Sequence, residues 1–193
     1  MSKKILIPMA PGCEELEAVT MINLFRRAGF AVKTATLAND TAPVVCARET
    51  AIVPDTTLDQ AMAEDFDLLA LPGGQPGTNN LMADDRLLSL IKSMNDNGKY
   101  IAAICAAPMV LGKAGILDGR NATSYPGCLD DIGLDICLKD DAVVIDEKII
   151  TSRGPGTAMD FTLQIIEILA GVEVRKGVEG GLQRPGTRQN GFA

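Results

Sequence analysis

The residue best suited to chemistry in this sequence is a cysteine that lies among small side chains. Cys105 follows the apolar run 101–104 and precedes Ala-Ala-Pro at 106–108. Small residues and a proline let a strand turn sharply into a helix, which is the geometry of a nucleophile elbow. A thiol at the start of a helix faces the positive end of the helix dipole, so we expect its pKa to lie below about 8.5. These residues alone also allow a second interpretation, in which Cys105 is an inert buried cysteine.

Two other groups are suited to assist such a thiol. Gly73 and Gly74 follow an apolar run, and their unshielded backbone N–H groups could point at a developing oxyanion, although Pro-Gly-Gly is also typical of a plain turn. Glu17 lies between apolar residues, so burial would raise the pKa of its carboxyl and let it act as a general acid or base. Glu14 and Glu15 are better explained as surface acids in the first turn of a helix.

Composition removes several classes of enzyme. The chain has no histidine, which excludes a Ser-His-Asp triad, a Cys-His dyad and an imidazole metal site. Its five cysteines include no C-x-x-C pair, so we expect reduced thiols and neither a disulfide framework nor a zinc ribbon. A net charge of -7 with scattered Lys and Arg argues against non-specific binding to nucleic acid or to anionic membranes, and we expect no specific nucleic-acid binding either. A small substrate or a protein partner fits this charge better.

The hydropathy pattern predicts a cytoplasmic protein. No apolar run approaches the roughly 18 residues that a membrane-spanning helix needs. The apolar residues before Pro8 are too few for the core of a signal peptide.

Apolar runs alternate with helical patterns along the chain, and this order predicts an α/β fold. Strands are expected at 5–7, 31–38, 66–71 and 100–104, hairpins at 44–54 and 142–152, and helices at 14–28, 79–94, from 107, and at 157–169. We predict one domain over residues 1–172, a flavodoxin-like sandwich whose mostly parallel sheet has helices on both faces and the short antiparallel hairpins at its edges. Residues 173–193 lack periodicity, which predicts a tail or a short capping segment.

In such a sheet, ligands bind beyond the carboxyl ends of the strands. The segments 12–17, 72–74 and 105–108 each follow a predicted strand. We therefore expect them to meet at one edge of the sheet.

Together these segments resemble the ThiJ/PfpI superfamily, and specifically its DJ-one branch, whose members include glyoxalase III-like enzymes and deglycases. The matching motifs occur in the family's order and cover almost the whole chain. They are APGCEELE at 10–17, RRAG at 26–29, LPGG at 71–74, AAICAAP at 102–108 and TSRGPGT at 151–157.

The resemblance implies a role for each matched residue. Cys105 corresponds to the family's reactive, easily oxidised cysteine, and Glu17 to the carboxylic acid that hydrogen-bonds its sulfur. Gly74 and Ala106 correspond to backbone amides that line the oxyanion site. By the same resemblance, Arg27 and Arg48 match arginines near a homodimer interface that packs the first helix against its mate.

One position departs from the family pattern. Many members carry a histidine in the segment that matches 123–126, and Tyr125 occupies that place here. A phenol donates a hydrogen bond but is a poor base at neutral pH, so proton transfer would fall on Glu17 alone.

The resemblance implies a cysteine-dependent enzyme that needs no cofactor and no metal. Its substrates would be reactive α-oxoaldehydes such as methylglyoxal, or glycated proteins and nucleotides, through a hemithioacetal on Cys105 with Glu17 as acid and base. These are the activities of a glutathione-independent glyoxalase and of a deglycase, and they share the same first covalent step. The alternative is a sensor of oxidative stress or a redox chaperone, in which Cys105 is oxidised to a sulfinate without significant turnover.

Overall fold

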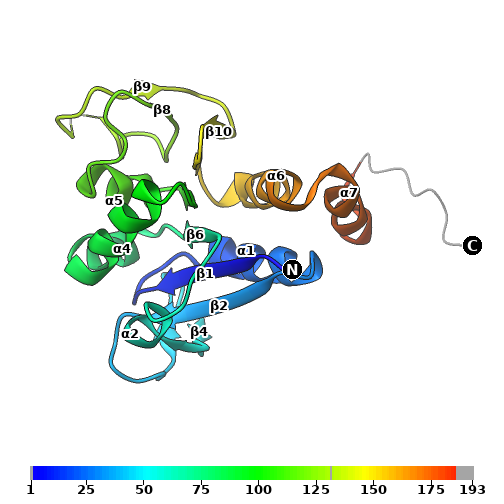
Figure 1. Cartoon of the computed structure of the whole chain (residues 1–193), viewed down its shortest axis with the longest axis horizontal. Helices are drawn as coiled ribbons and strands as arrows, with labels where there is room; N and C mark the ends of the chain where they lie inside the picture. The colour runs from blue at the N-terminus through cyan, green and yellow to red at the C-terminus, as the bar shows by residue number, and fades with distance from the viewer. Residues whose placement is uncertain (1, 131, 186–193) are drawn as a thin grey trace, which may run out of the picture.

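A seven-stranded sheet lies at the centre of the structure, a computed structural model that describes residues 2–130 and 132–185 (Figure 1). The strand order is β10-β11-β7-β6-β1-β2-β5. All neighbours are parallel except β10 and β11, so the predicted mostly parallel sheet is confirmed. The strands are β1 (Lys4–Met9), β2 (Ala31–Thr36), β5 (Thr56–Thr57), β6 (Leu68–Leu71), β7 (Tyr100–Ile104), β10 (Val143–Asp146) and β11 (Ile149–Ser152).

Helices cover both faces of this sheet, as the sequence predicts. Side chains alternate along β1, so Ile5 and Ile7 enter one apolar core and Leu6 enters the other. The first core is completed by α1 (Glu15–Arg27) and α6 (Ala158–Ala170). The second is completed by α2 (Leu58–Ala61), α3 (Gln75–Met82), α4 (Asp85–Asp96) and α5 (Pro108–Lys113). In Figure 1, α4 and α5 accordingly lie on one side of the strands and α6 lies on the other.

Both predicted hairpins are present, but only one of them extends the central sheet. β10 and β11 pair antiparallel, with β10 as the edge strand. β3 (Val44–Val45) and β4 (Ala51–Ile52) form a separate two-stranded sheet, which corrects the expectation that this hairpin would be an edge addition. Another small sheet, formed by β8 (Asn121–Ala122) and β9 (Cys137–Leu138), was not predicted.

The single helix predicted at 79–94 is wrong, because the chain forms two helices there. α3 ends at Met82 and α4 begins at Asp85. The carboxylate of Asp84 accepts hydrogen bonds from the N–H groups of Arg86 and Leu87, at 3.0 and 3.3 Å, and so caps the start of a new helix.

The segment after α6 contains a further helix. α7 (Val172–Gly181) packs against α6, which corrects the expectation that the chain after residue 172 has no helical period. The rest of the predicted tail includes residues 186–193, which lie outside the described residues. Within the described part of the chain, no helix is both long enough and apolar enough to span a bilayer.

Candidate functional site

The carboxyl ends of three adjacent parallel strands bring the predicted residues together. β1, β6 and β7 are neighbours in the sheet, so the segments that follow them lie at one edge. The segment after β1 leads to Glu17, the segment after β6 contains Gly73 and Gly74, and β7 is followed by Cys105. The convergence expected from the sequence is therefore present.

Cys105 occupies a strained turn between β7 and α5. Its φ angle is 65°, a left-handed conformation that a non-glycine residue adopts at a cost on the order of 1–3 kcal/mol. Two backbone hydrogen bonds hold it there: its N–H donates to Ser152 O at 2.9 Å, and its carbonyl accepts from Tyr125 N–H at 2.8 Å. The thiol-bearing residue is 8% exposed, so the pocket beside it is its route to solvent.

Glu17 projects from the first turn of α1 and is completely buried. Its Oε2 atom accepts a hydrogen bond from Gly73 N–H at 2.7 Å, and its Oε1 atom has no nitrogen or oxygen partner among the described residues. Burial raises the pKa of this carboxyl to about 7, and hydrogen bonds from Gly73 N–H and the Cys105 thiol oppose the rise only in part. The carboxyl can therefore hold or release a proton near neutral pH.

The pKa of Cys105 moves in the direction opposite to the sequence expectation. Burial raises the pKa of the thiol to about 12, and the negative charge of Glu17 adds to this rise. The expectation relied on the helix dipole alone, but α5 begins only at Pro108 and the sulfur lies buried beside a carboxyl. Hydrogen bonds from the N–H groups of Gly74 and Ala106 lower the pKa of the thiol, so these two amides point at the sulfur.

The two glycines after β6 have different tasks. Gly73 uses its N–H group to bind Glu17, so it is not free to stabilise an oxyanion as expected. A Cβ atom on Gly73 would lie 2.7 Å from the Cβ of Cys105 and 2.8 Å from Ile104 O, so this position has no room for a side chain. Gly74, with φ of 85°, directs its N–H at the sulfur.

A pocket of about 330 Å³ opens onto Cys105. Tyr125, which is 53% exposed, and Ala106 line it, as does Cys128, which the sequence gave no reason to place there. Arg48 also lines this pocket, and its backbone N–H donates to the carboxylate of Glu15 at 2.9 and 3.1 Å. The remaining lining residues are Glu14, Ala47, Gly74, Gln75, Pro76 and Pro155.

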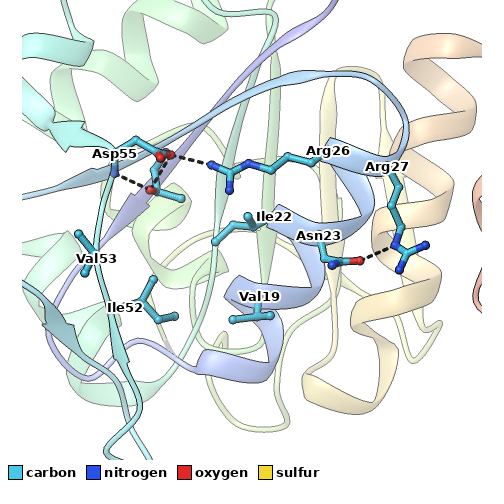
Figure 2. Close-up of a pocket in the computed structure, with 9 residues that line it drawn as sticks. Val19, Ile22, Asn23, Arg26, Arg27, Ile52, Val53 and Asp55 are labelled. Atoms are coloured by element: carbon cyan, nitrogen blue, oxygen red, sulfur yellow. Dashed lines mark hydrogen bonds and ion pairs between the residues drawn. The ribbon is translucent and has the colours of Figure 1, made fainter.

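Arg27 lines a different cavity from the one that Arg48 lines. It donates from Nε to Asn23 Oδ1 at 2.7 Å and lines a cavity of about 540 Å³ between α1 and the segment after β4 (Figure 2). Figure 2 shows apolar Val19 on the helix and Val53 on the other side of this cavity, whose lining includes no cysteine. Within one chain, the two arginines therefore do not form one site.

Comparison with known proteins agrees with this geometry. Residues 3–168 match the DJ-1/PfpI family. Protein dj-1beta of Drosophila melanogaster is 43% identical to this chain, over 94% of this chain and 97% of its own length. The crystal structure of Drosophila melanogaster DJ-1beta superposes with a TM-score of 0.90, covering 94% of this chain and 98% of the crystallised chain. The oxidised DJ-1 structure from Toxoplasma gondii has a TM-score of 0.89 at 36% identity, covering 94% of this chain and 98% of that chain. The glutathione-independent glyoxalase DJR-1.2 of Caenorhabditis elegans is 38% identical over 89% of this chain and 91% of its own length.

Proposed function

This chain belongs to the DJ-1/PfpI family, and we propose that it is a cofactor-independent enzyme that converts α-oxoaldehydes such as methylglyoxal into hydroxy acids. The observation that carries the proposal is the buried pair of Cys105 and Glu17, with two backbone N–H groups directed at the sulfur. A pocket of about 330 Å³ suits a small carbonyl compound, and a glycated side chain or base reaches the sulfur through the same opening. The relative named as a glyoxalase supports the choice of substrate.

The first step forms a carbon–sulfur bond. Glu17 takes the proton from the thiol of Cys105, and the thiolate attacks the aldehyde carbon of the substrate. The electron pair of the C=O bond moves to oxygen, where the N–H groups of Gly74 and Ala106 stabilise the oxyanion. Each such donor is worth about 2.7–4 kcal/mol of transition-state stabilisation. Glu17 then gives its proton to this oxygen, which forms a hemithioacetal and regenerates the carboxylate.

The second step moves a proton between carbons. Glu17 removes the proton from the former aldehyde carbon and delivers it to the neighbouring carbonyl carbon. The hydroxyl proton passes to the neighbouring oxygen, which becomes the hydroxyl of the product, and a thioester is left on Cys105. Water then hydrolyses the thioester, releasing the hydroxy acid and the free thiol. Tyr125 donates a hydrogen bond at the pocket mouth, and Glu17 carries the proton transfers because the chain has no histidine.

Conversion of methylglyoxal to lactate by purified protein tests this proposal. We expect turnover in the unaltered protein and loss of at least a hundredfold in kcat/KM for Cys105→Ser, whose hydroxyl is a far weaker nucleophile. Cys137→Ser is the matched control, because Cys137 is exposed and does not line the pocket. Equal rates in the protein and in Cys105→Ser would reject the proposal, as would equal losses in both serine variants.

The second candidate function is a sensor of oxidative stress, and one observation favours it. Glu17 Oε1 is buried without a nitrogen or oxygen partner among the described residues. An oxygen added to the sulfur of Cys105 would give the protonated carboxyl a hydrogen-bond acceptor at this position. The related Toxoplasma gondii protein was solved in an oxidised form. Mass spectrometry after mild peroxide treatment tests this function: selective sulfinate at Cys105 supports it, and equal oxidation of all five cysteines rejects it.

We also propose that the chain acts as a cytoplasmic homodimer through the outer face of α1. Apolar side chains on this face and beside it are exposed: Leu16 by 55%, Val19 by 47% and Val53 by 66%. Gathered apolar exposure of this kind marks an interaction surface. Val19 and Val53 line the cavity beside α1 that Figure 2 shows, and Arg27 lines it too, where it supplies a polar rim to this surface.

A further inference from the structure

Two buried thiols outside the Cys105 pocket lie against each other. The Sγ atoms of Cys13 and Cys46 are 3.5 Å apart. The two residues are 0% and 4% exposed, and neither lines the pocket. A thiol is a weak hydrogen-bond donor, so this contact adds little to stability, and the chemistry proposed above does not use it.

Backbone hydrogen bonds on both sides keep the two sulfur atoms opposite each other. Gly12 N–H donates to Val45 O at 2.8 Å, and Ala47 N–H donates to Cys13 O at 2.8 Å. These bonds fasten the turn after β1 to the β3–β4 hairpin. Because a disulfide bond is about 2.05 Å long, the sulfur atoms need to approach by only about 1.5 Å for the bond to form.

The hairpin also provides a route for an oxidant. β3 and β4 pair through only two residue pairs, and Glu49 in their turn has a φ of 67°. Because its own pairing is so short, this hairpin can open locally by breaking its few hydrogen bonds to the turn after β1, and it can close again on them. Burial raises the pKa of both thiols, so opening of the hairpin is the step that lets Cys46, the more exposed of the two, lose its proton.

We propose that Cys13 and Cys46 are a second redox site, a dithiol that hydroperoxides convert into an intramolecular disulfide without the help of Cys105. The sulfur of Cys46 attacks the terminal oxygen of the peroxide, and the O–O bond breaks. Cys46 becomes a sulfenic acid, and the rest of the peroxide departs as an alcohol with the thiol proton. The sulfur of Cys13 then attacks the sulfur of Cys46, the S–O bond breaks, and water leaves with the proton of Cys13. The two thiols lose two electrons and two protons in total, and the peroxide gains them as alcohol and water.

The disulfide would join two segments of the wall of the Cys105 pocket. Glu14 follows Cys13 directly, Ala47 and Arg48 follow Cys46, and all three line the pocket. Oxidation of the pair therefore fixes one side of the pocket. It also closes a loop between positions 33 residues apart, which restricts the unfolded chain.

Peptide mapping of a Cys105→Ser variant tests the proposal, because the reactive cysteine of the main site is then absent. The protein is exposed to cumene hydroperoxide, denatured, alkylated with iodoacetamide and cut with trypsin. Trypsin places Cys13 in the peptide 5–26 and Cys46 in the peptide 34–48. We expect these two peptides to appear joined, two hydrogens lighter than their sum, and to separate on reduction. The melting temperature should rise by roughly 10 °C on oxidation and return on reduction.

Cys13→Ala and Cys46→Ser in the same background are the matched controls. Each should lack the joined peptides and the rise in melting temperature, and two variants at different positions guard against one of them failing to fold. The proposal is overturned if Cys13 and Cys46 are both alkylated after an exposure that fully oxidises Cys105 in the unaltered protein. A melting-temperature rise that persists in either control would overturn it as well.

Discussion

Glu17 and Cys105 are 88 positions apart in the sequence, and their proton affinities depend on each other. An ionised Glu17 adds to the burial that raises the pKa of Cys105 to about 12. A protonated Glu17 removes that charge and can donate a hydrogen bond to a thiolate. Above about pH 7 the pair therefore holds one proton, which these pKa values place mainly on the sulfur, and the two N–H groups at the sulfur ease its transfer to the carboxylate. In the proposed mechanism, this proton transfer takes the place of a histidine base.

The raised pKa of Glu17 predicts how Glu17→Gln changes the pH dependence of stability. The unfolded carboxyl loses its proton near 4.5, whereas the folded one keeps it until about 7. The stabilisation from the neutral carboxyl is thus complete below pH 4.5 and is lost as the pH rises to 7. At about 1.4 kcal/mol per pH unit, the free energy of unfolding of the protein should fall relative to Glu17→Gln by on the order of 3 kcal/mol.

Urea denaturation at several pH values measures this difference. Glu173→Gln is the control, because Glu173 is exposed and its removal should leave the pH dependence unchanged. Parallel stability curves for the protein and Glu17→Gln would show that the carboxyl of Glu17 titrates normally.

Substitution of Gly73 by alanine should distort the site through steric overlap, without any change of charge. The Cβ atom of Gly73→Ala would lie within 3 Å of Cys105 Cβ, Ile104 O and Glu17 Oε2, none of which can move freely. We expect the free energy of unfolding to fall by about 1–3 kcal/mol, together with a loss of methylglyoxal turnover. In the control, Gly156→Ala, the new Cβ meets nothing within 4 Å, and its stability should stay within about 0.5 kcal/mol. Equal stability and turnover in Gly73→Ala and Gly156→Ala would mean that the backbone at Gly73 moves enough to accommodate a Cβ atom.

At the scale of elements, α1 begins in a way that places Glu17. The side chain of Glu14 accepts the N–H of Glu17 at 2.7 Å and caps the helix. Leu24 and Phe25 on the same helix are buried against the sheet, which fixes the orientation of the helix. A side chain in its first turn is thereby directed towards the end of β6.

The break between α3 and α4 gives a prediction for a single capping residue. Asp84 accepts two backbone N–H groups at the start of α4 and pairs with the guanidinium of Arg86, which holds the pKa of this carboxyl below its ordinary value. Asp84→Ala should lower the free energy of unfolding by about 0.5–2 kcal/mol. Asp85→Ala, in the same turn but exposed and outside the cap, should cost less. Thermal unfolding of both variants at neutral pH measures this difference. Equal decreases in stability would reject the assignment of Asp84 as the helix cap.

The elements that could be predicted from the sequence are those with enough residues to show a period. β1, β6 and β7 follow from their apolar runs, and α1 and α6 follow from their apolar stripes. β5 and β8 have two residues each, too few for a pattern, and they exist because neighbouring chain lies beside them. Asp84 is a residue type that often caps the start of a helix. The helical period that runs through residues 79–94 hid this start signal, so one helix was predicted where there are two.

The residues of the site could be predicted from the sequence, but their electrostatics could not. Cys105 and Glu17 were recognisable because motifs in a fixed order surround them. The pKa of Cys105 was not, because it depends on which charges the fold brings to a buried sulfur. The places of Cys128 and Arg48 in the pocket depend likewise on segments that only the folded chain brings together.

At the scale of the whole molecule, the proposed homodimer would form through the exposed apolar face of α1. Val53 is 66% exposed beside the cavity that Figure 2 shows, so a second copy would bury it. Val53→Asp would place a charge without a partner in that contact and should convert a dimer into a monomer in light scattering, because breaking such contacts costs several kcal/mol. Ile145→Asp is the matched control: Ile145 is also an exposed apolar residue, but it lies on β10 at the far edge of the sheet, and its change should leave the dimer mass unaltered. A monomeric mass for the unaltered protein, or dissociation by Ile145→Asp and not by Val53→Asp, would place the interface elsewhere or remove it.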